Sequence, residues 1–203
     1  MKKILLLIHF LSFHVISELT LEITQGTEDP YRVAIIKFSG ADKSATNIQK
    51  VIFDNLLRTG EFTIFNDEDL LSIPQIEEDI VFNDFRILDI DFLVMGKVKD
   101  DGLNVTVEYQ VFDISKAKKI RTSTVYGIPN KNRQLAHYVS DGIYQEITGI
   151  PGIASTKILY VTEDNNFKLQ ISDADGNNEQ VLLESPEPII SPSWSPDSKK
   201  VAY

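Results

Sequence analysis

Apolar and polar residues alternate strictly from residue 18 to residue 25. Leu19, Leu21 and Ile23 share one face, and this period of two predicts a half-buried strand. Turn-forming residues between Gln25 and Pro30 then break the pattern, so we expect the strand to be only loosely tethered to the rest of the chain. A terminal strand of this kind has unpaired edges and can pair with its own sheet or with another chain.

After residue 30 the pattern predicts a mixed α/β domain. Apolar, β-rich runs predict strands at residues 31–38, 62–65, 92–98, 103–112 and 121–128, with a hairpin turn at 100–102. Helical spacing predicts a helix between Thr46 or Asn47 and Gly60, a turn of helix in 67–72, a helix over 82–88, and one from Leu135 to Gly149. This order predicts a mixed sheet with helices around one core over residues 30–150, followed by a linker.

A repeat near the end of the sequence predicts the start of a second domain. The segment 157–160 (Lys-Ile-Leu-Tyr) recurs at 200–203 (Lys-Val-Ala-Tyr), a spacing of about 43 residues within the period of about 40–45 of four-stranded propeller blades. We expect residues 155–203 to form one blade of a β-propeller and the opening strand of the next, with Trp194 in the blade core. Propellers close with about four to eight blades. We therefore expect either the N-terminal part of a longer protein or a product that has lost most of its second domain.

The first residues predict export. Met1, Lys2 and Lys3 precede an apolar run from Ile4 to Ile16, and Ser17 follows it. This is the pattern of a secretory signal peptide over residues 1–17, and the run is too short to span a membrane. Residues 18–29 then form the N-terminal strand and its tether. An exported chain without cysteine suits a bacterial periplasm.

The charge balance disfavours nucleic acid and anionic lipid as partners, because the net charge is −10. Acidic residues gather between Glu61 and Asp91, and we interpret them as a solvated face rather than a docking surface. Basic residues cluster at one place, which we interpret as a solvated hairpin end: Lys116, Lys118, Lys119 and Arg121.

The sequence has no evident catalytic centre. His137 is the one histidine after residue 17, and it lies about 200° around its helix from Leu135 and from Val139. We therefore expect its side chain to face solvent. No nucleophile motif or phosphate-binding loop accompanies it, so we expect no enzymatic activity, no cofactor and no small-molecule substrate.

Four residues have the spacing of calcium-loop ligands: Asp173, Asp175, Asn177 and Glu184. Asn178 stands where such a loop needs glycine, and residues 181–183 have the character of a strand. We therefore expect no metal there. The segment instead predicts a tight turn in which Asp173 and Asp175 accept backbone N–H bonds and Gly176 supplies a positive φ.

Four segments resemble the TolB family, the periplasmic component of the Tol-Pal system of Gram-negative cell envelopes. They are residues 21–26 (Leu-Glu-Ile-Thr-Gln-Gly), the helix from Leu135 to Ile150, the turn 171–177 (Ile-Ser-Asp-Ala-Asp-Gly-Asn) and the segment 191–197 (Ser-Pro-Ser-Trp-Ser-Pro-Asp). They follow the family's order and span nearly the whole mature chain.

The resemblance implies a non-enzymatic adaptor with an α/β domain and a six-bladed propeller. In the family the propeller binds the lipoprotein Pal, the N-terminal strand binds TolA, and the system constricts the outer membrane during division. On this chain the resemblance assigns TolA binding to the N-terminal strand: Glu18, Leu19, Thr20, Leu21, Glu22, Ile23 and Thr24. Because the sequence stops in the second blade, the resemblance supports Pal binding by this chain less directly than it supports TolA binding.

Two other interpretations remain open from the sequence. Propellers of this repeat type also precede α/β-hydrolase domains, so the chain could be the N-terminal part of an exported hydrolase or peptidase. It could also be a free-standing α/β binding module with a vestigial blade. Sequence beyond Tyr203 would discriminate them, because a downstream G-x-S-x-G motif would indicate the peptidase.

Overall fold

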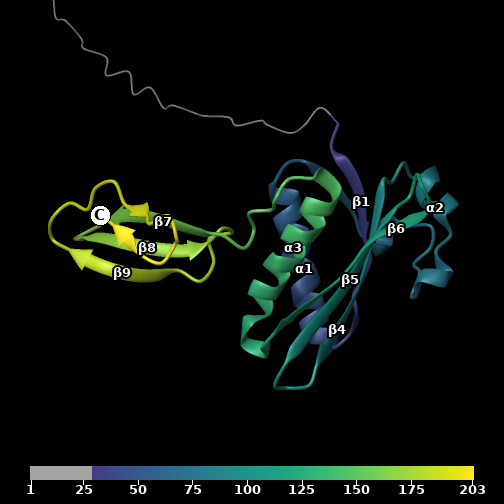
Figure 1. Cartoon of the computed structure of the whole chain (residues 1–203), viewed down its shortest axis with the longest axis horizontal. Coiled ribbons are helices and arrows are strands. Elements are labelled where there is room, and N and C mark those ends of the chain that lie inside the picture. Colours follow the sequence, from purple (N-terminus) through teal and green to yellow (C-terminus); the bar gives the residue numbers. More distant parts are fainter. Residues whose placement is uncertain (1–28) are drawn as a thin grey trace, which may run out of the picture.

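The computed structural model describes residues 29–203 (Figure 1). The proposed signal peptide and all seven proposed TolA-binding residues lie outside this part of the chain. Within residues 29–203, none of the helices combines the length and apolar character that crossing a membrane requires.

An α/β domain with one mixed sheet forms the larger, N-terminal part of the structure. Its strands are β1 (Tyr31–Ile35), β2 (Ser39–Gly40), β3 (Phe62–Phe65), β4 (Phe92–Asp100), β5 (Val105–Asp113) and β6 (Lys118–Gly127). The order is β3-β1-β4-β5-β6, with β2 attached to β4. Strand β1 is parallel to both of its neighbours, whereas β4, β5 and β6 are antiparallel. The predicted hairpin between β4 and β5 is confirmed.

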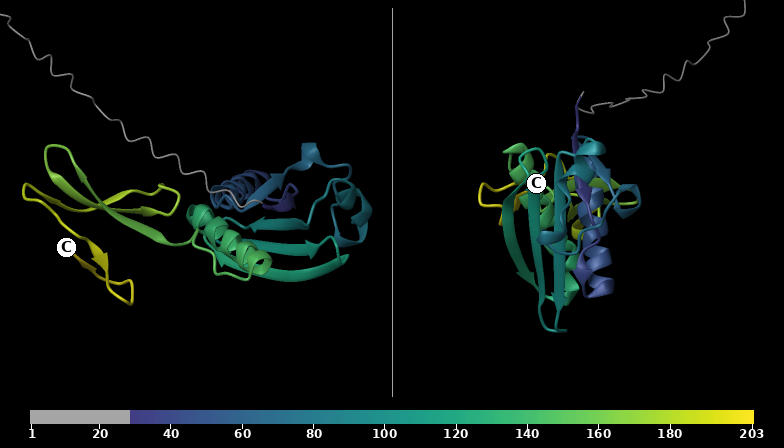
Figure 2. Two further views of the ribbon diagram at one scale, coloured as in Figure 1. Left: turned by 90° about the horizontal axis from the view of Figure 1, so that it is seen from above. Right: turned by 90° about the vertical axis from the view of Figure 1, so that its right-hand side faces the viewer.

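Helices cover both faces of this sheet (Figures 1 and 2). Helices α1 (Asp42–Arg58) and α3 (Asn132–Thr148) pack on one face, and the short α2 (Phe82–Ile87) lies on the other. Along β5 the side chains alternate accordingly: Val107, Tyr109 and Val111 point into the core under α1 and α3, whereas Phe112 joins the core under α2. Three 3-10 turns complete the domain: Asp67–Asp69, Glu77–Asp79 and Pro129–Lys131.

The two long helices end where the sequence predicts, but α1 begins earlier than predicted. Gly60 and Gly149 have φ of 73° and 76°, so both glycine stops are confirmed. The predicted start of the first helix at Thr46 or Asn47 is wrong, because α1 begins at Asp42. Backbone contacts set this start: the Ala41 amide donates to the Val98 carbonyl, and the Ala41 carbonyl accepts the first helical bond. A strand neighbour thus replaces the side-chain cap that the sequence suggested.

The basic cluster lies at the end of the β5–β6 hairpin, where Lys116 and Lys118 are exposed as expected and Lys119 and Arg121 are half-buried. Strand β6 begins at Lys118 rather than Arg121. Lys119 pairs with Glu77, and Arg121 pairs with Glu146 of α3. Lys116 pairs with Asp113, whose pKa falls to about 2 because bonds from Lys116 and Ser115 outweigh the opposing effect of burial. Neighbouring acids therefore neutralise most of the cluster.

The C-terminal part of the structure is the start of a β-propeller whose sheets do not close. Strands β7 (Lys157–Glu163), β8 (Phe167–Asp173) and β9 (Gln180–Ser185) form an antiparallel sheet in that order. Strands β10 (Ser193–Trp194) and β11 (Val201–Ala202) form a separate pair. The two copies of the repeat therefore lie on β7 and β11. Trp194 pairs with Val201 in the second unit, so that unit opens with two strands rather than the single strand expected.

Candidate functional site: the junction of the two domains

The linker after α3 folds back along that helix. Asp141 Oδ1 accepts a bond of 2.7 Å from the Ala154 amide, and Oδ2 accepts one of 3.0 Å from the Ser155 amide. Gly152 passes so close that a Cβ atom there would lie 2.4 Å from Asp141 Oδ1. A single carboxylate of α3 therefore positions the chain directly before β7.

We expect Asp141→Asn to loosen this linker. The amide keeps one acceptor oxygen and turns an N–H₂ group toward a backbone N–H, and a bond to a charged group contributes about 1.5–3 kcal/mol. We expect hydrogen exchange at Ala154 and Ser155 to become at least about tenfold faster, since about 1.4 kcal/mol corresponds to tenfold. Asp164→Asn, at an exposed position of the β7–β8 turn, is the matched control. Unchanged exchange in Asp141→Asn would show that other contacts hold the linker.

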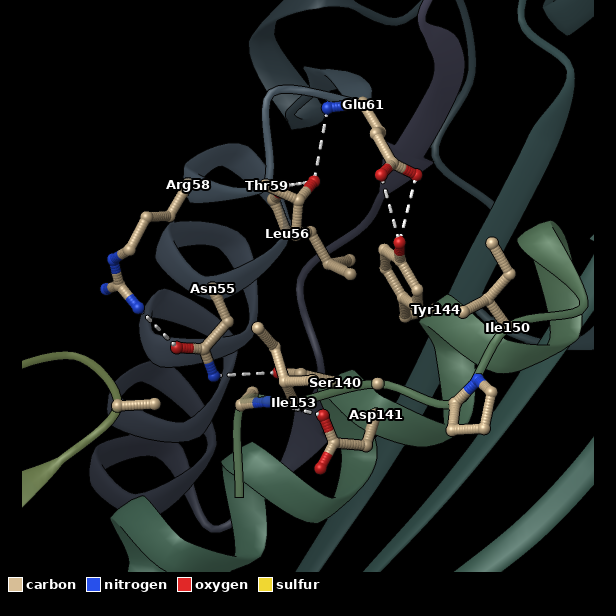
Figure 3. A pocket seen from close by; sticks show the side chains of 14 residues that line it. Asn55, Leu56, Arg58, Thr59, Glu61, Ser140, Asp141, Tyr144, Ile150 and Ile153 are labelled. Carbon is tan, nitrogen blue, oxygen red and sulfur yellow. Dashed lines mark hydrogen bonds between the residues drawn. The ribbon is translucent and has the colours of Figure 1, made fainter. Parts of the chain in front are cut away.

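A cavity of about 320 Å³ lies between α1, α3 and this linker (Figure 3). Its walls are largely apolar, with Leu56, Ile150, Pro151 and Ile153 among the lining residues. Tyr144 donates to Glu61 at 3.0 Å from each carboxylate oxygen, and burial together with this carboxylate raises the pKa of the Tyr144 hydroxyl. The cavity is therefore suited to an apolar group next to the Tyr144 hydroxyl, which is hydrogen-bonded to Glu61.

His137 is buried at the same junction, and the prediction that it faces solvent is wrong. Its exposed fraction is 2%, and its neighbours Leu135 and Ala136 are buried as well. Two buried faces of α3 explain this. One stripe packs on the sheet, and the small residues Ala136 and Ser140 allow α1 to approach the helix from another side.

The imidazole of His137 belongs to a buried polar group shared by α1 and α3. Asn55 Nδ2 lies 2.9 Å from His137 Nδ1 and 2.9 Å from Ser140 Oγ. The Ser140 hydroxyl donates to the Ala136 carbonyl, so its oxygen must accept from Asn55. The same amide nitrogen therefore donates to His137 Nδ1, and the neutral ring carries its proton on Nε2.

Two carboxylates from the propeller side face that Nε2 atom. Asp175 Oδ2 lies 3.5 Å away and Asp173 Oδ2 lies 3.9 Å away. Arg133, one turn before His137 on α3, forms an ion pair with Asp175, and Lys157 of β7 forms one with Asp173. The end of β8 thus docks on α3 through charged and polar side chains.

The turn after β8 has much of its predicted form. Gly176 has φ of 79°, and the Asp175 carboxylate accepts a bond of 3.0 Å from the Asn177 amide, as expected. The Asp173 carboxylate differs from the prediction, because it accepts from the side chains of Lys157 and Asn178. The turn therefore leaves both aspartates directed toward the first domain.

The calcium-loop spacing does not correspond to an assembled set of ligands. Glu184 accepts a bond of 2.9 Å from Asn166 at the far end of the sheet, away from Asp173 and Asp175. The aspartates instead meet His137, which the spacing rule did not include. The usable signal was the pair Ala136 and Ser140, because small residues four apart mark a second helix contact beside the apolar stripe.

Both domains of the chain match models of known protein families. Residues 19–120 match the model of the TolB amino-terminal domain, and residues 144–203 match that of the TolB beta propeller domain. The Tol-Pal system protein TolB of Alcanivorax borkumensis is 37% identical over 192 residues, covering 92% of this chain and 44% of that protein. The protein of the same name from Nitrosococcus oceani is 39% identical over 198 residues, covering 93% and 45%.

A solved structure agrees with these sequence matches. The crystal structure of TolB from Acinetobacter baumannii superposes with a TM-score of 0.79 at 32% identity, covering 90% of this chain and 45% of that one. The chain spans about half the length of the curated relatives it matches. The matches run through both domains and the junction between them, and the chain belongs to the TolB family.

Proposed function

We propose that this chain serves as a non-enzymatic periplasmic adaptor of the Tol-Pal system. In this role it links TolA of the inner membrane with Pal of the outer membrane, maintains envelope integrity and contributes to outer-membrane constriction during division. The observation that carries the proposal is the continuous similarity, at 37% identity, to a Tol-Pal system protein over 92% of the chain. The rival hydrolase is not favoured, because the relatives described above carry the Tol-Pal name.

The proposed partner of the first domain is TolA, bound through residues 18–24. Leu19, Leu21 and Ile23 alternate with polar residues, as strand addition to a partner sheet requires. In this mode backbone hydrogen bonds supply the affinity and alternate side chains fill pockets. The segment precedes β1 in the sequence, so we expect it to pair without unfolding the domain. Pal would bind the propeller, of which this chain carries the start.

Proline at Leu21 tests this model. Leu21→Pro removes one backbone donor and fixes φ, so we expect it to weaken binding to the C-terminal domain of TolA at least about tenfold more than Leu21→Ala does. Deleting residues 18–25 should abolish binding. Titration calorimetry measures the affinities, and circular dichroism checks that each variant keeps its fold.

The alanine variant is the matched control, because it removes the same side chain and keeps the backbone donor. Undiminished binding by the deletion variant would contradict the strand model. Attention would then move to the acidic region between Glu61 and Asp91. Equal losses in the proline and alanine variants would show that the Leu21 side chain, rather than its backbone, carries the affinity.

A further inference from the structure

The junction between α3 and the β7–β9 sheet contains a buried titratable group that the proposed function does not use. His137 Nε2 is buried and has no hydrogen-bond partner among residues 29–203. It points toward Asp175 and Asp173, at 3.5 Å and 3.9 Å. A buried polar atom without a partner is rare in folded proteins, which calls for an explanation of this one.

A metal ion does not explain the group. Asp175 is already paired with Arg133, and Asp173 is already paired with Lys157. A divalent cation would have to share these carboxylates with the positively charged side chains of Arg133 and Lys157. The bond from Asn55 to Nδ1 also leaves the proton on Nε2, the atom that a metal would need unprotonated.

Proton uptake is also disfavoured while the junction is closed. An imidazolium carries N–H groups on both nitrogens, and its Nδ1–H would then oppose the Asn55 amide N–H₂. Reversing that amide does not resolve the conflict, because its oxygen accepts from Arg58 and reversal would set two donors against each other.

The surrounding charges act in both directions. Burial of the ring lowers the pKa of His137. The carboxylates of Asp175, Asp173 and Asp141 raise it, and Arg133 lowers it. The net effect is a pKa below the ordinary value of histidine. Two further polar groups face the carboxylates rather than the ring: Lys157 of β7 and Asn178 of the turn after β8. The ring is therefore uncharged in the closed junction near neutral pH.

We propose that the contact between α3 and the β7–β9 sheet is a proton-sensitive junction, closed while His137 is neutral and opened by its protonation. Separating the β8 turn from α3 would return the imidazole to water. There it can rotate away from Asn55 and bind a proton on each nitrogen. Low pH thus favours the open form, and neutral or slightly basic pH favours the closed form.

The direction of the pH effect follows from linkage. A histidine whose pKa is lowered in the closed form stabilises that form fully above its ordinary pKa of about 6.5. This stabilisation is lost as the pH falls from about 6.5 toward the lowered value. One proton changes the ratio of open to closed molecules by up to about tenfold per pH unit in this window. The Asp175 carboxylate, whose pKa is lowered, titrates below about 3.8 and does not contribute there.

Fluorescence energy transfer across the junction measures this ratio in the full chain. The sequence has no cysteine, so Lys50→Cys on α1 and Asn165→Cys in the β7–β8 turn provide two unique labelling sites. We expect the transfer efficiency to change between pH 7.5 and pH 5, with a midpoint below about 6.5. In His137→Gln we expect the change to disappear.

The matched control removes the other two histidines. Residues 18–203, without the proposed signal peptide, contain His137 as their only histidine, so the pH-dependent change should persist in this shorter chain. Loss of the change in the control would overturn the assignment to His137. So would an unaltered change in His137→Gln.

A second measurement needs no substitution at the junction. Nuclear magnetic resonance of the His137 ring in the full chain should give a pKa below about 6.5 and a neutral ring protonated on Nε2. A pKa at or above 6.5, or energy transfer that stays constant while the ring titrates, would overturn the proposal. Zn²⁺ added at pH 7.5 should leave the ring signals unchanged, and their loss at stoichiometric Zn²⁺ would assign the site to a cation instead.

Discussion

Replacing Gly142 by alanine is expected to destabilise the α/β domain strongly. A Cβ atom at this position of α3 would lie 2.0 Å from the hydroxyl oxygen of Tyr109, whose exposed fraction is 2%. That hydroxyl is held by a bond of 3.1 Å from Arg121 Nε, so the ring cannot simply turn away. Overpacking of a core costs about 1–3 kcal/mol and occasionally more. The better helix propensity of alanine offsets about 1 kcal/mol. Because 2.0 Å is a severe overlap, we take the upper end of this range and expect a net loss of about 2 kcal/mol in urea unfolding.

Tyr109→Phe supplies the matched background for this experiment. The hydroxyl oxygen is the clashing atom, and the next ring atom is 3.2 Å from the added Cβ. In this background we expect Gly142→Ala to be close to neutral, because removing the oxygen opens the required space. Equal destabilisation in both backgrounds would show that the close approach of Tyr109 is not the reason for glycine in α3.

Removal of the propeller segment is expected to change the association state of the protein. Both outer strands of the β7-β8-β9 sheet lack a neighbour on one side within residues 29–203. Val181 of β9 is 53% exposed and Ile190 is 73% exposed, so apolar surface accompanies the free edges. Unpaired edges of this kind promote association between chains. We expect residues 18–203 to show a mass that rises with concentration in light scattering, and residues 18–150 to stay monomeric.

Val181→Lys tests the edge itself. A lysine on an outer strand opposes pairing with another edge, so this variant should shift the association of residues 18–203 to higher concentration by about tenfold or more. Ile73→Lys, which alters an exposed apolar residue of the first domain, is the control. A concentration-independent mass for residues 18–203 would contradict the prediction, as would an equal effect of both lysines.

Periodicity and turn residues predicted most of the fold. The hairpin between β4 and β5 and the stops at Gly60 and Gly149 depend on residues close in sequence, and all of them are confirmed. The start of α1 escaped prediction because a backbone contact with Val98 replaces a side-chain cap. No local pattern encodes such a contact between distant segments.

The junction was the least predictable part of the molecule. The face of α3 that carries His137 becomes buried only because α1 and the turn after β8 reach it from elsewhere in the chain. The close approach of His137 to Asp175 spans two domains, and a single sequence offers no signal for it. The ion pairs of the basic cluster escaped prediction for the same reason, because Glu77 and Glu146 lie far from Lys119 and Arg121 in sequence.

Three residues of α3 that step by four, Arg133, His137 and Asp141, lie against the propeller side of the molecule, while the stripe from Leu135 to Ile143 serves the first core. The α/β domain ends at Gly149 in the sequence, but its stabilising contacts therefore extend into the linker and the propeller segment. A chimera that joins this α/β domain to the propeller of a relative would therefore keep the surface complementary only where that propeller has acidic residues in place of Asp173 and Asp175. In the design of such a chimera these two aspartates and the three α3 residues should be exchanged together.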